Sequence, residues 1–481
     1  MEQSNLNVIK TIRKLNYKDL IIFLIPCIIF LYYLHVFDPG ILRYDSYNQF
    51  HQIATNNFKN WHPFFHTFIE MFCIKIYPNL LSVSILQIFT FSTIWMCICK
   101  FYRNEENNNR IFLLQAIITL IIALIPINAI YSITLLKDIL FSYFMLLLCF
   151  LIAVFLDKNC KVNNLFLIII SATMAVIAQL RPNGLFIILT FLVILCIYIY
   201  RKNKSHKLLV YIPILTIVFI LLIGSLNMAY DVEDNQKDAV FAKVGHMLVD
   251  YDLNLDLNKG DRTKIHKIID EKSSKEKYVI TYSDPIYFNS HKNVYEDNKT
   301  TYIWMAIKYS IKNPIHFVEY LFGSSPMVWD ITRDDDWVGI PYETNITKAK
   351  DDFYNPSKKY VQTPTNYIDN ATAKNSETSE YKNLESLVNY FRDNQITDTL
   401  FYSPALYMFL AFISMILIHW ITKSKEIYLI YLPNMLNIIV IFLSTPIQDY
   451  RYLYPNLLVF YMILIMLISI YQKSQIKAQS F

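Results

Sequence analysis

Ten long hydrophobic runs dominate the pattern of this chain of 481 residues. Each run holds about 18 or more residues without Asp, Glu, Lys or Arg, which is the length that a helix needs to cross the core of a bilayer. We therefore predict an all-α polytopic membrane protein with about ten transmembrane helices. The runs are residues 20–37, 79–99, 111–136, 139–156, 162–180, 182–200, 208–230, 399–422, 427–448 and 452–472.

Lysine and arginine residues cluster near both termini and in every second connection between the runs. Because basic residues are retained on the cytoplasmic side of a membrane, this pattern predicts one topology, with both termini in the cytoplasm. The first run is expected to stay in the protein as a helix, because no small-residue cleavage site follows it. The basic clusters lie before residue 20 and within 100–110, 158–161, 201–207, 423–425 and 473–477.

This topology leaves one long connection on the outer side, and it divides the chain into three parts. Residues 1–230 would form an N-terminal membrane module with spans 1 to 7, and residues 399–481 would form a C-terminal module with spans 8 to 10. The segment 231–398 is long enough to be a separate extracytoplasmic domain.

The expected outer domain is mostly helical. Apolar residues at three- and four-residue spacing predict helices within 241–255 and 301–325, the second broken at Asn313 and Pro314. Residues 343–382 are polar and aperiodic, which predicts a flexible loop.

The first outer connection, residues 38–78, contains an unusual apolar segment beginning with "HPFFHTF". This segment also carries His62, His66, Glu70 and Lys75. A full span here would invert every later connection against the basic pattern. We therefore predict surface helices in this connection, including an amphipathic helix on the outer membrane surface.

Composition agrees with the membrane class, at 54% hydrophobic residues, 16% aromatic residues and only 7 glycines. The formal net charge of +5 comes mainly from the cytoplasmic anchors, so it argues for membrane orientation and against nucleic-acid binding. All seven cysteines lie in or beside apolar runs, which argues against a disulfide framework in the outer domain.

Ionisable residues also occur where four outer connections meet the membrane, and a charged group persists there only when other interactions offset its desolvation. Each could be an interface anchor or a local ion pair. Their position on one face predicts that they converge on one site, and arginine is suited to a two-pronged grip on phosphate oxygens. These residues are Asp38, Arg43, Asp45, Lys137, Asp138, Arg181, Asp449 and Arg451.

The order of these motifs resembles that of the GT-C glycosyltransferases, in particular protein mannosyltransferases, aminoarabinose transferases and the bacterial membrane proteins grouped with them. The resemblance covers the membrane module and leaves most of 231–398 unmatched. The similar positions are Asp45, "WHPF" at 61–64, Lys137-Asp138, "RPNG" at 181–184 and "RYLYP" at 451–455.

The resemblance implies transfer of a sugar from a polyprenyl-phosphate donor to a cell-envelope glycan, lipid or protein, with inversion at the anomeric carbon. Asp45 would be the catalytic base, and Asp138 is the second candidate catalytic carboxylate. Ser46 stands where a second acidic residue is common, which leaves open whether Asp45 acts alone, with Asp138 or Asp38, or through a metal. A divalent cation is left open. Lys137, Arg181 and Arg451 would bind the donor phosphate, and Arg43, Trp61, His62 and Tyr452 would line the substrate groove.

Two other functions remain open at this point. An O-antigen-type polysaccharide polymerase or ligase would also have many spans, a large outer loop and outer arginines. A non-enzymatic flippase or transporter for a lipid-linked sugar would place ionisable groups at the middle of the bilayer and often has repeated halves. The charge-free runs and the lack of a repeat argue against a transporter, and Asp45 favours the transferase.

Overall fold

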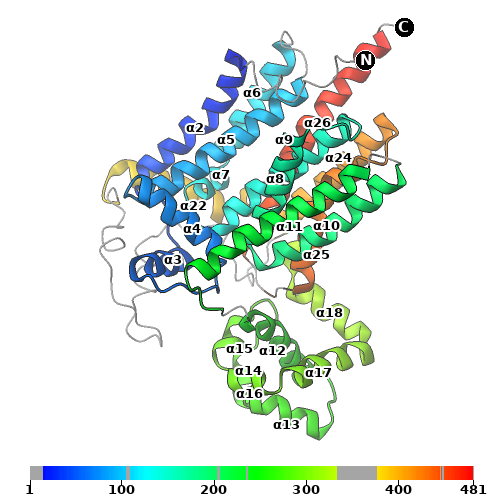
Figure 1. Cartoon of the computed structure of the whole chain (residues 1–481). Helices are drawn as coiled ribbons and strands as arrows, with labels where there is room; N and C mark the ends of the chain where they lie inside the picture. The colour runs from blue at the N-terminus through cyan, green and yellow to red at the C-terminus, as the bar shows by residue number, and fades with distance from the viewer. Residues whose placement is uncertain are drawn as a thin grey trace.

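A computed structural model describes residues 15–103, 109–202, 206–234, 237–332, 376–444, 446 and 449–479, and these residues form helices joined by short connections (Figure 1). Seven of the helices are long and apolar enough to cross a membrane, so the protein is an all-helical, multi-pass membrane protein. They are α2 (Tyr17–Val36), α5 (Leu81–Arg103), α8 (Lys137–Asp157), α10 (Pro182–Arg201), α11 (His206–Ala229), α24 (Pro404–Thr422) and α26 (Tyr454–Gln479).

The three remaining apolar runs form helices that are broken or shorter. The run at 111–136 is divided into α6 (Asn109–Leu124) and α7 (Pro126–Ser132), which meet at an angle of 71°. The break falls at Pro126, which has no amide hydrogen to continue the ladder of α6. Helices α9 (Asn164–Leu180) and α25 (Tyr428–Ser444) have 17 residues each. Each predicted run thus contains an apolar helix, and the count of ten spans stays a prediction.

Helix α8 lies at the centre of the bundle. In its most apolar stretch 83% of the residues are buried, against 17% in α11 at the edge. Helices α5, α9, α25 and α26 pack around it, and α2, α11 and α24 pack outside these. The first residues of α8 are therefore held from several sides.

The first outer connection folds into α3 (Tyr44–Thr55) and α4 (Phe64–Ile76), which confirms helices there. Helix α4 turns its polar residues inward, since His66 and Glu70 are fully buried, while Phe72 and Ile76 are 56% and 69% exposed. This arrangement suits a helix whose outer face meets lipid. Its place on the membrane surface stays a prediction.

The outer domain has its own hydrophobic core, built from tyrosines such as Tyr251, Tyr295 and Tyr309. The predicted break at Asn313 and Pro314 is confirmed, because one helix ends at Lys312 and the next begins at Pro314. The helices of this domain are α12 (Lys237–Asn254), α13 (Lys259–Ile268), α14 (Glu271–Lys277), α15 (Asp284–Phe288), α16 (Lys292–Asp297), α17 (Lys299–Lys312) and α18 (Pro314–Ser324). The short helix α19 (Pro326–Trp329) follows them and packs on α24 and α25 in the core of the membrane bundle.

The last part of the expected outer segment packs on the membrane module instead. Helices α22 (Ser379–Asp393) and α23 (Gln395–Tyr402) share the core of the bundle. The ring of Tyr381 lies 5.0 Å from that of Phe37, at the end of α2. Most of the loop expected at 343–382 lies outside the described residues, and α22 begins within its final part.

Candidate functional site

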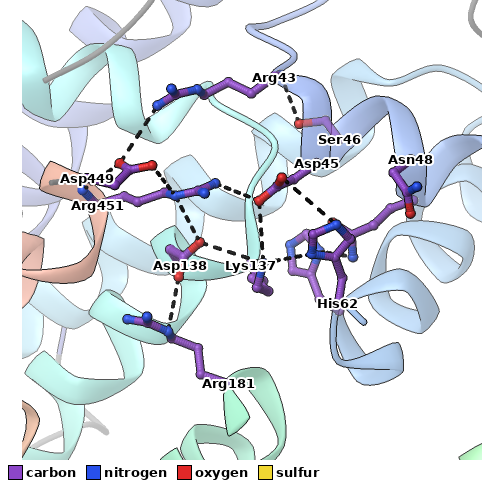
Figure 2. A network of polar contacts seen from close by, with 12 residues as sticks. Arg43, Asp45, Ser46, Asn48, His62, Lys137, Asp138, Arg181, Asp449 and Arg451 are labelled. Atoms are coloured by element: carbon purple, nitrogen blue, oxygen red, sulfur yellow. Dashed lines mark hydrogen bonds and ion pairs between the residues drawn. The ribbon is translucent and has the colours of Figure 1, made fainter. Parts of the chain in front are cut away.

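Charged side chains from four connections meet at one end of the bundle, next to α3 (Figure 2). We call them the charged cluster. Seven of the eight residues predicted to converge belong to it, so the convergence is confirmed for these seven and stays a prediction for Asp38. The segments are the turn into α3, the start of α8, the turn between α9 and α10, and the short 3-10 helix η1 (Tyr450–Tyr452) before α26. The cluster comprises Arg43, Asp45, Lys137, Asp138, Arg181, Asp449 and Arg451, with His62 beside it.

Backbone hydrogen bonds hold the segment before Asp45 against the segment before Lys137. The chain after α2 turns at Gly40, whose φ of 114° favours glycine. Ile41 N–H then donates to Ile133 O at 2.9 Å, and Leu135 N–H donates to Ile41 O at 3.0 Å. Ser46 Oγ also donates to Leu135 O at 2.6 Å. The start of α3 is thereby fixed against the segment that leads into α8.

A tight turn presents Arg181. Arg181 ends α9 in an extended conformation, and Pro182 begins α10 at the first helical position, where proline is favoured. Gly184 packs directly on the backbone of α9, where a Cβ atom would collide with the carbonyl oxygen of Ile177. The two helices can approach this closely only because residue 184 is glycine.

Asp45 is held by two cations. Its Oδ2 lies 2.8 Å from Arg451 Nη1 and 3.6 Å from Lys137 Nζ. Burial raises the pKa of Asp45, but the opposing charges, that of Arg451 foremost, outweigh burial and hold this pKa well below its usual value. Asp45 is therefore an ionised carboxylate at neutral pH.

His62 contacts Lys137 and lies close to Asp45. Lys137 Nζ lies 3.1 Å from His62 Nδ1, and His62 Nε2 lies 3.9 Å from Asp45 Oδ1. Burial and the charge of Lys137 lower the pKa of His62 to about 3, so the ring is neutral. A lysine ammonium can only donate, so Nδ1 is the acceptor and we assign the ring hydrogen to Nε2, facing Asp45.

Asp138 joins the two arginines that come from distant turns. Its Oδ1 lies 3.1 Å from Arg181 Nε, and its Oδ2 lies 3.6 Å from Arg451 Nε. The side chain of Asp138 is fully buried. The Tyr452 ring lies between these arginines, 4.3 Å from the guanidinium carbon of Arg181 and 5.2 Å from that of Arg451. These are distances at which a cation and a ring attract.

Asp449 closes the cluster at the turn before α26. It lies 2.8 Å from Arg451 Nε and 3.8 Å from Arg43 Nη1. The cluster then has four permanent cations and three carboxylates, with His62 neutral. Three guanidinium nitrogens of the cluster, Arg43 Nη1, Arg181 Nη1 and Arg451 Nε, are buried without a hydrogen-bond acceptor among the described residues. An oxyanion would supply both the missing charge and the missing acceptors.

Eight of the nine predicted site residues lie in or against the cluster, and Trp61 does not. The Trp61 side chain is 41% exposed, and its ring lies 5.8 Å from that of Tyr287 in the outer domain. That contact brings α15 over the site. Asp284, the first residue of α15, accepts a hydrogen bond from Tyr282 at 3.1 Å, and burial raises its pKa, with a further contribution from Asp45. Nothing in the sequence marks Asp284 as a neighbour of Asp45.

A second polar group lies buried between α3 and α4. Gln49 Nε2 lies 3.1 Å from His66 Nδ1 and 2.9 Å from Thr67 Oγ1, and Glu70 lies 3.5 Å from His66. Both carboxylate oxygens of Glu70 lack a hydrogen-bond partner among the described residues, and burial raises the pKa of Glu70 well above its usual value. Burial therefore favours the protonated form of Glu70 over the charged form. The sequence showed His66 and Glu70 four residues apart but not that they face inward.

Within the described ranges, no three His, Cys, Asp or Glu residues are placed to hold a metal ion. The cluster thus pairs carboxylates with arginine and lysine, an arrangement suited to an anionic ligand and to proton transfer. Comparison with protein-family models, curated proteins and solved structures finds no match for this chain.

Proposed function

We propose that this protein is a ten-span, GT-C-like inverting glycosyltransferase. It moves a sugar from a polyprenyl-phosphate donor to a cell-envelope acceptor on the outer side of the membrane. One observation carries the proposal: the ionised carboxylate of Asp45 lies directly against Arg451 and Lys137, two cations of a cluster with excess positive charge. A proton acceptor beside a phosphate site is what this reaction requires.

The roles follow from the chemistry. The acceptor hydroxyl attacks the anomeric carbon and gives its proton to Asp45, while the bond from that carbon to the phosphate oxygen breaks. Negative charge then grows on the departing phosphate. Lys137, Arg181 and Arg451 are fixed cations that stabilise this charge, and fixed cations act strongly because they need not reorganise during the reaction.

The contacts suggest a way in which donor binding prepares the base. Asp45 has a low pKa because Arg451 and Lys137 face it, and such a carboxylate is a weak base. A bound phosphate would place its own negative charge beside both cations and close to Asp45. The pKa of Asp45 would then rise, so the base would become effective only when donor is present.

Asp138 fits a positioning role better than the direct catalytic role expected for it. It is fully buried, and it contacts Arg181 and Arg451, which come from turns far apart in the sequence. We propose that Asp138 orients these two arginines toward the phosphate.

Replacement of Asp45 by Asn tests this function. Asp45→Asn keeps the size of the side chain but removes the proton acceptor, so transfer should fall by roughly 100-fold or more. The measurement uses purified protein in liposomes with a radiolabelled polyprenyl-phosphate sugar and cell-envelope extract as acceptor. Binding of polyprenyl phosphate, measured in parallel, should persist.

Asp157→Asn is the matched control, because Asp157 is 54% exposed at the other end of α8 and pairs with the adjacent Lys158. It should transfer as the wild type does. If Asp45→Asn also transferred sugar within a few-fold of wild type at equal protein levels, Asp45 would have no part in catalysis and the transferase proposal would lose its main support.

A lipid-linked sugar transporter is the second candidate, and the buried pair His66 and Glu70 favours it. Protonatable groups inside membrane proteins often serve proton-coupled transport. A transporter would move labelled polyprenyl-phosphate sugar across the liposome membrane without acceptor, and Glu70→Gln would abolish this movement. A transferase would release free polyprenyl phosphate only when acceptor is present.

A further inference from the structure

An apolar stripe runs along the exposed side of α17 and α18 in the outer domain. Both helices carry it at the same spacing of three and then four residues, which places the side chains of each helix in one row. The exposed fractions are 64% for Trp304, 39% for Ile307 and 73% for Ile311 on α17, and 75% for Ile315, 49% for Val318 and 45% for Phe322 on α18.

The stripe is separate from the side on which these helices pack into their own domain. Tyr302, Met305 and Tyr309 of α17 and Tyr320 and Leu321 of α18 are buried in the core of the outer domain. The domain therefore does not use the stripe for its internal packing. Six large apolar side chains in two aligned rows are more than the scattered exposed residues of an aqueous surface, and such a patch marks an interaction site.

The stripe continues onto the surface of the membrane module. The ring of Phe322, at its end, lies 5.2 Å from that of Phe442 in α25. Helix α25 is itself apolar and exposes Ile439 and Leu443, which are 42% and 50% accessible. In Figure 1, one end of α18 lies beside the end of α25, and α18 runs across the direction of the membrane helices. The exposed apolar surface of α18 thus extends the exposed apolar surface of α25.

Polar residues lie beside the stripe, as at a membrane interface. Lys312 is exposed at the end of α17, and the Glu319 side chain is 69% exposed on α18. A helix with one packed face, one apolar face and one polar face matches the boundary between lipid and water. Trp304 at the far end also fits, because tryptophan is enriched at headgroup level.

We propose that the stripe of α17 and α18 inserts into the outer interface of the lipid bilayer and docks the outer domain on the membrane. The partner is the boundary between lipid headgroups and acyl chains. Lipid contact then fixes the position of this domain, including α15 above the charged cluster, independently of the reaction at the cluster.

Spin labels test the proposal in full-length protein reconstituted in phosphatidylcholine and phosphatidylglycerol vesicles. The background has all seven native cysteines replaced by alanine, and the labelled variants are Ile315→Cys and Val318→Cys. Oxygen concentrates in lipid and a nickel chelate stays in water, so we expect both labels to collide with oxygen several-fold more often than with nickel. Leu221→Cys, on an exposed part of α11, is the lipid control, and Lys272→Cys, with a side chain 83% exposed on α14, is the water control.

Two results would overturn the proposal. Labels at 315 and 318 that collide with nickel as often as the label at 272 would place the stripe in water. Labels that collide with neither reagent would show that protein covers it, either a second copy or another part of this chain. If the cysteine-free chain does not fold, hydroxyl-radical footprinting of the wild type in the same vesicles decides: Trp304 and Phe322 should be protected while Phe288, 63% exposed in the structure, is oxidised.

Discussion

At the scale of single residues, one arginine holds the charged cluster together. Arg451 lies 2.8 Å from Asp45, 2.8 Å from Asp449 and 3.6 Å from Asp138, so one guanidinium contacts all three carboxylates of the cluster. Lysine could not replace it, because an ammonium is a single point of charge without a planar fork of donors. The buried carboxylates therefore depend on a residue that is far from Asp45 and Asp138 in the sequence.

Removal of Arg451 should destabilise the protein strongly. Arg451→Gln leaves Asp45, Asp138 and Asp449 without their shared partner, and breaking a buried ion pair costs about 3–5 kcal/mol. We expect a clearly lower midpoint of thermal unfolding in detergent, and Arg451→Lys should recover only part of it. Lys275→Gln, which affects an exposed pair with Glu271 on α14, should change stability by about 0.5 kcal/mol or less. Equal midpoints for Arg451→Gln and wild type would contradict the shared role of Arg451.

Stability should fall with acidity because two buried histidines resist protonation. Burial lowers the pKa values of His62 and His66 from 6.5 to about 3. Both histidines bind a proton more tightly in the unfolded chain, so protonation favours unfolding. Their contribution to the free energy of unfolding is therefore fully present above pH 6.5 and is lost as the pH falls toward 3. The unfolding midpoint of wild type should therefore decrease over this range. The double variant His62→Gln/His66→Gln should show a shallower decrease, and an unchanged slope would exclude these histidines as its cause.

At the scale of helices, the site depends on how closely two of them approach. Arg181 stands at the turn between α9 and α10, and Gly184 lets α10 rest on the carbonyl of Ile177. Any side chain at residue 184 pushes the helices apart. Such a shift moves Arg181 relative to Asp138, on the adjoining α8.

Gly184→Ala should thus both destabilise the bundle and impair the site. Overpacking of this kind costs about 1–3 kcal/mol, which would lower the unfolding midpoint, and polyprenyl-phosphate binding should weaken as Arg181 moves. Gly224→Ala in α11 is the matched control. Its added Cβ would lie 3.4 Å from the end of the Gln179 side chain, which can move aside. If the two alanine variants behaved alike, close contact at residue 184 would not be what positions Arg181.

The helices could be predicted from the sequence far better than their breaks and contacts. Charge-free runs and the Asn313-Pro314 pair mark helices that the structure contains. The hydropathy of residues 111–136 did not indicate the 71° bend at Pro126. Hydropathy measures how apolar a segment is and carries no information on the direction in which its helices run. Residues of the cluster could be found from their shared face, but the sequence did not indicate which of them pair: Arg43 is two residues from Asp45 and yet faces Asp449. Arg43 is extended while Asp45 is in the first turn of α3, so their side chains diverge.

At the scale of the whole molecule, the cluster and the outer domain lie toward the same end of the bundle, away from the start of α2 and the end of α26 (Figure 1). The basic residues predict that this end faces away from the cytoplasm. Reporter proteins fused after residues 300 and 424 test the prediction. A reporter that works only outside the cytoplasm should give a signal when fused after residue 300. A reporter that works only in the cytoplasm should give a signal when fused after residue 424. A cytoplasmic signal at 300 would put the cluster on the wrong side for an envelope acceptor.

The pairing of Asp45 with Arg451 has a consequence for the making of the protein. These partners are separated by 406 positions, and Arg451 stands just before the last helix. During synthesis, Asp45 and Asp138 are translated close to their partners Lys137 and Arg181 but long before Arg451, the cation that contacts both of them. Asp45 and Asp138 gain their contact with Arg451 only when the final helix has been inserted. A chain that stops before residue 451 would leave Asp45 and Asp138 without the guanidinium that they share, a defect open to the proteases of membrane quality control.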